Sequence, residues 1–524
     1  MENYESQASV CRLKEERRQL ATSISKQLEE TIQDKEVLIH QLKNLETREE
    51  TLRRDCAILH NLVAPVSDLA DEVLSTIFEA TMELEETPFP RVGEVLSRVS
   101  HRWRSISVNT PKLWANIQFP GVRRGKWRER TAVYLTRSNS IPLNIHVQLP
   151  RREDITVNLL EIIGDHIGRC RQLLFGLPLA DDVLPILCDS LLWRPLPLLT
   201  SFSLILPEGA NGQDPLSFVP SHAPHLRTLE IGSFALRYHR ILHLDVFASL
   251  TSLRLTQVVI HVTSYVTIRR GFMNMQRLQH LEINLDNGLM GPIHSDLIPL
   301  PSVECLHVSS HRYQHHLMPT FIGIIEAGSL KALSLRSWKD GRLRQKIVNF
   351  PSLQHLVLTD ISEVLCPDLS ELSQTFPNIE RLTWNVEEGI IKSVEETLTY
   401  ILRNIRGTGE LMIWLHLHTI EISIAEGRLE PRHDGLALSA AILELEQSNH
   451  LIRKLRLPAA FINSASQENL ASLRALVALE EFYDDWPTPF AGGSKRSVSK
   501  ISSSAYTVTV LTNPSQDLKF VIET

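Results

Sequence analysis

Apolar residues near the start of the chain recur every seven positions. From Met1 to Ala64 there is no proline or glycine, and the good helix formers Glu, Lys, Arg, Gln and Leu dominate. The seven-residue stripe, which includes Ile24, Leu38 and Leu45, predicts one long helix of the coiled-coil kind. Two interpretations stay open, a homodimer through residues 10–63 or a single amphipathic helix that folds back on the following domain.

Shorter helices are predicted after Pro65, whose ring and missing N–H end the long helix. The run from Val66 to Phe78 has acidic residues in its first turn and apolar residues at positions 73, 74, 77 and 78. A second amphipathic helix is expected over residues 95–106, with apolar positions 95, 96, 99, 103 and 106 on one face. Residues 110–114 close this small three-helix unit.

A different period begins at Leu199, where the pattern Leu-x-x-Leu-x-Leu recurs at intervals of 23 to 28 residues. Such spacing is typical of leucine-rich repeats, in which each repeat contributes one strand. Weaker, more widely spaced strands are expected around Leu417, Ile452 and Leu479, and longer helices separate the strands in this part of the chain, for example over residues 394–405. Because no repeat buries its apolar side alone, stacking predicts an extended concave sheet that suits a protein ligand. The exposed strand positions expected to form this substrate-binding surface are Glu230, Arg254, His280, Glu282, His307, Arg336, His355 and Arg381.

The predicted fold class is α/β, with an N-terminal long helix or coiled coil, the small three-helix unit and an irregular leucine-rich-repeat solenoid. The expected boundaries are 1–64 for the helix, 65–120 for the three-helix unit and 199–490 for the repeat domain. Residues 121–198 form a connecting region with early strands around Leu143, Ile145, Val147 and Leu173. Residues 491–524 are expected to hold a Gly/Ser-rich flexible linker and a terminal strand.

Composition argues against several classes of partner but does not identify the function. The 524 residues carry 54 Lys and Arg against 61 Asp and Glu, a net charge of −7, so nothing global attracts nucleic acid or acidic lipid. A basic cluster surrounds Trp127, but the missing second basic stripe argues against nucleic-acid binding. The six cysteines are scattered without a Cys-x-x-Cys pair, which indicates free thiols in a reducing compartment, the cytoplasm or nucleus. No apolar run reaches the roughly 18 residues that a membrane span needs.

Motifs of catalysis are missing from the sequence. There is no phosphate-binding loop, no Gly-x-Ser-x-Gly elbow and no His-Glu-x-x-His zinc helix. The histidines at 307, 311, 315 and 316 lack carboxylate or cysteine partners at ligand spacing. We therefore expect no catalytic residue, no metal and no cofactor, and the protein is predicted not to be an enzyme.

The segment from Pro65 to Phe119 resembles the F-box, in the version of the fungal, basidiomycete-type family in which a coiled coil precedes the box. The matching elements are Leu69 to Phe78, Val99 to Ile106, and Thr110 to Trp114, in the family's order and spacing. At Ala70 these proteins usually have proline, a difference that favours a scaffold over a ligase receptor.

This resemblance implies a substrate receptor of an SCF-type cullin-RING ubiquitin ligase. The F-box, residues 65–120, would bind a Skp-family adaptor, and the repeats would hold an unidentified protein substrate. The alternative is a non-degradative scaffold that joins proteins through its coiled coil and repeats. Adaptor-binding positions implied by the resemblance are Leu69, Ala70, Glu72, Val73, Leu74, Ile77, Phe78, Leu96, Val99, Trp103, Ile106, Leu113 and Trp114.

Overall fold

The structure, a computed structural model, divides into two compact units, Met1–Ile77 and Phe78–Thr524. The described residues are 2–84, 91–119, 127–148, 161–176, 194–204, 219–220, 222–232, 245–260, 265–288, 297–310, 317–338, 350–360, 369–386, 394–405, 414–424, 442–443 and 452–490. The linker and terminal strand expected over 491–524 lie outside them.

The first unit is built around the long helix α1, Glu2–Val63, which confirms the helix predicted from the sequence. It ends just before Pro65, where the short 3₁₀ helix η1, Pro65–Asp68, begins. All side chains from Lys14 to His60 are exposed, including the apolar ones at Leu28, Leu45 and Leu52. In the single chain, therefore, this part of α1 buries none of its apolar stripe.

Short helices follow in the F-box-like segment. They are α2, Asp71–Leu84, then α3, Val92–Leu96, and α4, His101–Val108. The single helix expected over 95–106 is thus two helices, because Ser100 has an extended backbone and its Oγ accepts a hydrogen bond from the Trp103 amide at 3.1 Å. An N-cap of this kind begins a new helix and ends the previous one.

Trp114 anchors the end of this segment inside the second unit. It lies in the 3₁₀ helix η2, Pro111–Trp114, is 1% exposed, and donates from Nε1 to the Ser107 carbonyl at 2.7 Å. The ring of Tyr134 packs edge-on against it, and the Arg137 guanidinium lies 4.4 Å from its ring centre. Both partners belong to α5, Trp127–Arg137, so the helices and the beginning of the sheet share one core.

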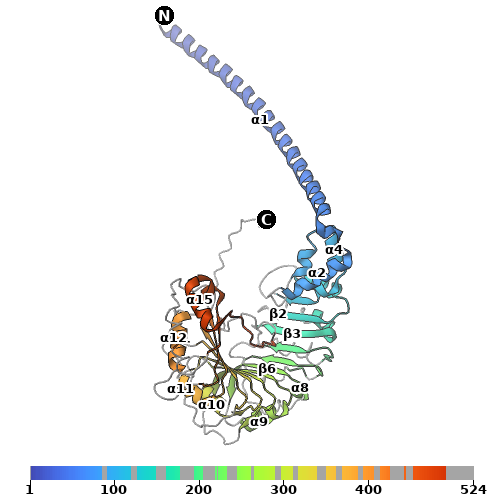
Figure 1. Ribbon diagram of the computed structural model, residues 1–524. Coiled ribbons are helices and arrows are strands. Elements are labelled where there is room, and N and C mark those ends of the chain that lie inside the picture. The colour runs from blue at the N-terminus through green and yellow to red at the C-terminus, as the bar shows by residue number, and fades with distance from the viewer. Residues whose placement is uncertain are drawn as a thin grey trace. The chain divides into compact units, whose positions relative to one another are not determined.

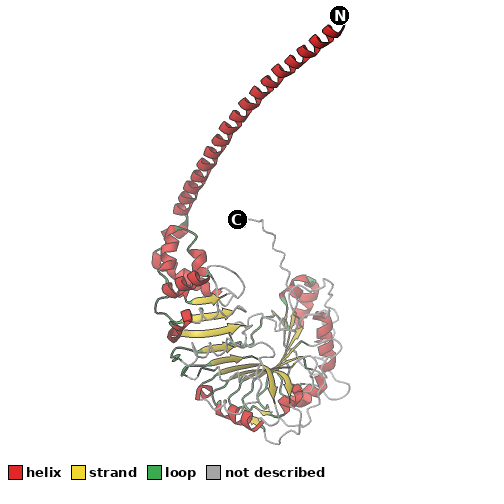
Figure 2. Ribbon diagram, turned by 180° about the vertical axis from the view of Figure 1, so that it is seen from behind, coloured by secondary structure: helices red, strands yellow, loops and turns green. Residues whose placement is uncertain are grey.

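One parallel sheet of 14 strands occupies the second unit, with neighbouring strands following one another in chain order. Figures 1 and 2 show the sheet curving, with helices along its outer side. The strands are β1 Asn116–Phe119, β2 Leu143–Gln148, β3 Cys170–Gly176, β4 Ser201–Leu204, β5 Thr228–Ile231, β6 Ser252–Ile260, β7 His280–Gly288, β9 Cys305–Ser310, β11 Ala332–Arg336, β12 His355–Thr359, β13 Arg381–Val386, β14 Thr419–Ile424, β15 Lys454–Leu457 and β16 Ala478–Glu481.

Short helices connect many of these strands, as parallel pairing requires. In the described part of the chain no helix is long and apolar enough to cross a membrane. Two further strands, β8 Ile298–Pro299 and β10 Ile325–Glu326, form a separate parallel pair. The remaining helices are η3 Ile167–Arg169, α8 Asp245–Ala248, α9 Tyr265–Asn274, α10 Leu317–Gly323, α11 Leu369–Thr375, α12 Val394–Ile405, α14 Ala459–Ser464 and α15 Gln467–Leu476.

The leucine pattern forms the core, because side chains alternate along a strand and its two strand leucines point to the same face. Leu356 and Leu358 of β12 and Leu382 of β13, for example, are fully buried. Strands occur at each of the predicted Leu-x-x-Leu-x-Leu positions from Leu199 to Leu479, and α12 covers the predicted helix 394–405. These local predictions are confirmed.

The predicted assembly of these elements is wrong. We expected an irregular leucine-rich-repeat solenoid beginning at Leu199, whereas the structure has an α/β fold with one continuous 14-stranded parallel sheet and helices. Three strands, β1 to β3, precede Leu199 and pair with the rest in the same order. Of these, β2 and β3 lie where the early strands were expected, around the buried Leu143 and Leu173, whereas β1, which buries Ile117, was not predicted.

Candidate functional site on the polar face of the sheet

One residue from each of eleven successive strands lies in a single register row across the sheet. In the first ten of these strands it occupies the position between two buried apolar residues, so its side chain points to the opposite, polar face, and Glu480 of β16 continues the row in the same register. We call this set the central row: Ser203, Glu230, Arg254, Glu282, His307, Ser334, Val357, Thr383, Glu421, Arg456 and Glu480.

All eight substrate-binding positions predicted from the sequence lie on this face. Four belong to the central row, and the other four lie two residues before or after it on their strands, which keeps them on the same face. Arg336 of β11 is one of these, with its Nε 4.0 Å from Asp360 Oδ2. The prediction that all eight are exposed is wrong, since Glu230, His280 and Glu282 are only 5–7% exposed and the other five are half-buried.

A first ion-pair cluster explains this burial on β5 to β7. Arg254 bridges two carboxylates, with Nη1 3.1 Å from Glu230 Oε1 and Nε 2.6 Å from Glu282 Oε2. His280 Nε2 lies 2.7 Å from the other oxygen of Glu282. Burial alone would raise the pKa of Glu282, but the His280 hydrogen bond and the Arg254 charge outweigh it and hold that pKa at about 2. Ser203 donates to Glu230 at 2.8 Å and completes the cluster.

Two histidines in the middle of the face bond to hydroxyl groups. His307 Nδ1 lies 2.8 Å from Ser334 Oγ, and His355 Nε2 lies 2.8 Å from Thr383 Oγ1. Burial, reinforced by nearby arginine charges, lowers the pKa of each histidine to about 4. Both imidazoles are therefore neutral at pH 7 and act as hydrogen-bonding and stacking groups.

A second ion-pair cluster surrounds Glu421, whose side chain is fully buried. Arg381 Nε and Nη2 each lie 2.7 Å from one of its two oxygens, and Arg456 Nη1 lies 2.8 Å from Oε1. Thr383 donates to Oε2 at 2.6 Å. Glu480 extends the cluster toward solvent by pairing with Arg456 at 3.0 Å and Lys454 at 2.7 Å.

Glu421 and Arg456 were missed by the sequence analysis. They lie on the last, widely spaced strands, where the repeat pattern is weak. A signal was nevertheless present, because both occupy the polar position between the last two apolar anchors, as Glu230 and Arg254 do. Extending the same rule to every strand would have found them.

The helical positions predicted to bind the adaptor divide into buried and exposed ones. On α2, Val73 and Ile77 are 46% and 43% exposed, whereas Leu74 and Phe78, one position further along, are 0% and 1% exposed. Phe78 packs on the Trp103 ring at 4.8 Å. The remaining positions are exposed at Ala70, Glu72 and Val99, half-buried at Leu69, Leu96 and Trp103, and buried at Ile106, Leu113 and Trp114. The buried ones form core, so only the others are available to a partner.

The polar face carries ion pairs, hydroxyl groups and imidazole rings. Groups of these kinds can bind a peptide through ion pairs and stacking. In the described ranges, no three or more His, Cys, Asp or Glu side chains are grouped so that they could hold a metal ion. His311, His315 and His316 lie outside those ranges.

No known protein family model matches the chain, and no curated protein sequence matches it significantly.

Proposed function

We propose that the protein is an F-box substrate receptor of an SCF-type cullin-RING ubiquitin ligase. The observation that carries the proposal is the pair Val73 and Ile77, two branched apolar side chains one helical turn apart that are nearly half exposed on α2. They lie within the segment that resembles the F-box, at positions that the resemblance assigns to the Skp-family adaptor. Covering such a pair with a partner removes apolar surface from water and stabilises a complex.

In this proposal the polar face of the sheet holds the protein substrate. The receptor contributes no chemistry of its own; it raises the concentration of substrate lysines near a charged conjugating enzyme. A homodimer through residues 10–63 would add avidity, and the exposed apolar stripe of α1 supports it.

The compartment belongs to the same proposal. Three cysteines of the described chain, Cys56, Cys170 and Cys305, are free thiols. Free thiols are usual in reducing compartments, which supports the cytoplasm or nucleus, where cullin-RING ligases would meet the protein.

Calorimetric titration of the full chain with a fungal Skp-family adaptor tests the proposal. The wild type should bind, and Val73→Asp and Ile77→Asp should each weaken binding by about 2 to 3 kcal/mol, roughly a hundredfold in Kd, because a charge would be buried in an apolar contact. Val133→Asp is the matched control, since Val133 lies on α5, is 38% exposed and is not an implied adaptor position. Leu74 is unsuitable for this test because its burial would make Leu74→Asp a folding mutant.

A folded wild type that does not bind the adaptor would contradict the proposal. The second candidate function, a non-degradative scaffold, would then be favoured by the exposed apolar stripe of α1. That alternative needs only dimerisation and the sheet, and not the exposed pair on α2.

A further inference from the structure

A short segment after the last strand lies across the polar face of the sheet. The sequence Phe482-Tyr483-Asp484-Asp485-Trp486-Pro487-Thr488-Pro489-Phe490 follows β16, and we call it the crossing segment. Its first amide, that of Phe482, still donates to the Leu457 carbonyl at 2.8 Å, as a continuing strand would. The prolines further on have no N–H to pair with a strand, which favours an extended path over the face.

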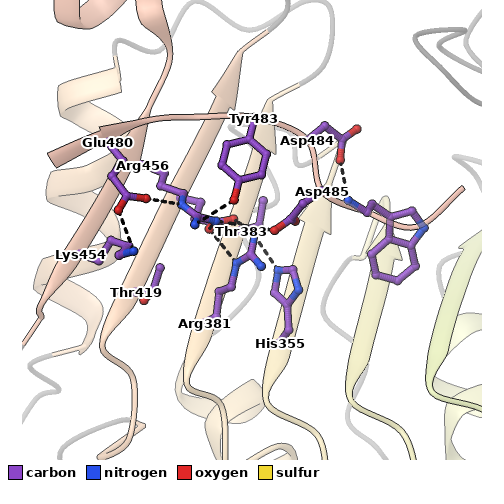
Figure 3. A network of polar contacts seen from close by, with 12 residues as sticks. His355, Arg381, Thr383, Thr419, Lys454, Arg456, Glu480, Tyr483, Asp484 and Asp485 are labelled. Atoms are coloured by element: carbon purple, nitrogen blue, oxygen red, sulfur yellow. Dashed lines mark hydrogen bonds and ion pairs between the residues drawn. The ribbon is translucent and has the colours of Figure 1, made fainter. Parts of the chain in front are cut away.

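Over the first half of its path, the crossing segment contacts arginines of the sheet through one aromatic and one acidic side chain, Tyr483 and Asp485. Arg456 of β15 lies 4.7 Å from the centre of the Tyr483 ring and donates to its hydroxyl at 3.2 Å. Asp485 then accepts from Arg381 of β13 at 2.7 Å, and its other oxygen lies 3.6 Å from Arg456. In Figure 3 the coil that carries Tyr483 and Asp485 passes over the strands that carry Arg456, Arg381 and His355.

Aromatic rings make the contacts of the second half. Trp486 lies edge-on to His307 of β9 at 6.4 Å and to His280 of β7 at 5.9 Å. Phe490 lies 5.7 Å from His280 and 4.2 Å from the Arg254 guanidinium of β6. Phe490 is 3% exposed, so it is the anchor of the segment. The crossing segment thus contacts four of the eight substrate-binding residues predicted from the sequence: Arg254, His280, His307 and Arg381.

Charge on the sheet explains why an acidic residue lies at Asp485. The second ion-pair cluster has three cations but two carboxylates when the crossing segment is left out: Arg381, Arg456, Lys454, Glu421 and Glu480. Asp485 supplies the balancing negative charge, and the arginines hold the pKa of Asp485 below its usual range against the effect of burial. The face therefore selects a carboxylate at this point.

The crossing segment lies on the sheet as a bound ligand would, because part of it stays exposed to solvent and it leaves a buried polar atom of the sheet without a hydrogen bond in the described part of the chain. Tyr483 is 57% exposed, and the Asp485 side chain is 32% exposed. Beneath the rings of Trp486 and Phe490, the buried His280 Nδ1 makes no hydrogen bond within the described residues. The face thus keeps a polar group that the present occupant does not satisfy.

We infer that the face from β6 to β15 binds a protein segment in which an aspartate or glutamate is followed by aromatic residues, and that the crossing segment occupies this site until such a segment displaces it. The inference rests on the proposed function, because it names the class of substrate that the receptor would take. The order of the contacts gives the pattern: an acidic residue over Arg381, an aromatic ring over His280 and His307, and a second ring over Arg254.

The Kd expected for a free peptide follows from the covalent connection between the crossing segment and the sheet. A short linker gives an effective concentration in the mM range, so a site closed about nine-tenths of the time requires a free peptide to bind the open face with a Kd of about 100 µM or tighter. The closed wild type should bind the same peptide about tenfold more weakly.

The test measures fluorescence polarisation of a labelled peptide, residues 482–490, against the full chain. Trp486→Ala, which opens the face, should bind this peptide at least tenfold more tightly than wild type. Asp485→Asn should act in the same direction, and it replaces Trp486→Ala if that variant does not fold. In Asp485→Asn both arginines stay paired with Glu421. Peptides carrying Asp485→Asn or Trp486→Ala should compete at least tenfold less well. The Asp484→Asn peptide is the matched control and should compete as well as the unchanged one, because Asp484 accepts from the Trp486 amide inside the segment.

Two results would overturn the inference. One is a folded, opened variant that does not bind the peptide below 1 mM. The other is equal binding by wild type and variants, which would show that the crossing segment does not occupy the site. Adaptor titration of the same preparations keeps the proposals apart: adaptor binding without peptide binding overturns only this inference, and peptide binding without adaptor binding overturns only the proposed function.

Discussion

Replacing Glu421 by glutamine removes the one fully buried carboxylate of the second ion-pair cluster while keeping its size. The variant leaves Arg381 and Arg456 facing an amide that has one oxygen and no charge. In the wild-type protein both arginines lie 2.7 to 2.8 Å from carboxylate oxygens of Glu421. Breaking a buried ion pair by removing one partner costs about 3 to 5 kcal/mol, because it leaves the other charge without compensation. Asp485 still pairs with both arginines, so we expect the lower end of this range, about 3 kcal/mol.

Thermal unfolding followed by circular dichroism measures this loss. A unit of about 400 residues unfolds with an entropy of about 2 cal/mol/K per residue, so each kcal/mol lowers Tm by roughly 1 °C. Glu421→Gln should therefore lower Tm by about 3 °C. Glu480→Gln is the matched control, because Glu480 also pairs with Arg456 but its side chain is 41% exposed, and it should leave Tm unchanged. Equal shifts for the two variants would refute the argument that burial decides the strength of these pairs.

Three further predictions concern other parts of the chain. Trp114→Ala should cost about 3 to 5 kcal/mol in a urea titration, because a fully buried ring and its hydrogen bond are lost; a cost below 1 kcal/mol would contradict its place in the core. Acidification from pH 7 to 5 should lower stability by at most roughly 2 kcal/mol for each of His307 and His355, since their pKa values of about 4 in the folded protein let only the unfolded chain take up protons below pH 6.5; His307→Gln and His355→Gln should each reduce this pH dependence, and unchanged dependence would contradict it. Leu45→Lys with Leu52→Lys should convert a dimer into a monomer in sedimentation, and a monomeric wild type would contradict the proposed coiled coil.

Local structure could be predicted from the sequence where burial imposes a period. The strands have two apolar residues flanking one polar residue, which fixes both the strand and its buried face. The helix 394–405 has apolar residues at helical spacing and is found as α12. The break at Ser100 was missed because the apolar positions on both sides of it continue one helical period, whereas the cap depends on a single side chain.

Contacts between distant strands could not be predicted in the same way. Arg381 pairs with Glu421 40 positions later and with Asp485 104 positions later, and nothing in the local sequence marks these partners. The crossing segment has no period and was included in the repeat domain, so its place on the polar face was not foreseen. Likewise, the period of α2 reveals an apolar side but not that Leu74 is buried while Val73 stays exposed.

Co-expression of the chain with a fungal Skp-family adaptor, followed by size-exclusion chromatography with light scattering, tests whether the chain is an adaptor-binding receptor. The two proteins should elute together, with one adaptor for each receptor chain. The chain carrying Val73→Asp and Ile77→Asp should elute without the adaptor. Its Tm should equal that of the wild type, which shows that the variant is folded. A folded wild-type chain that elutes without the adaptor would contradict the claim.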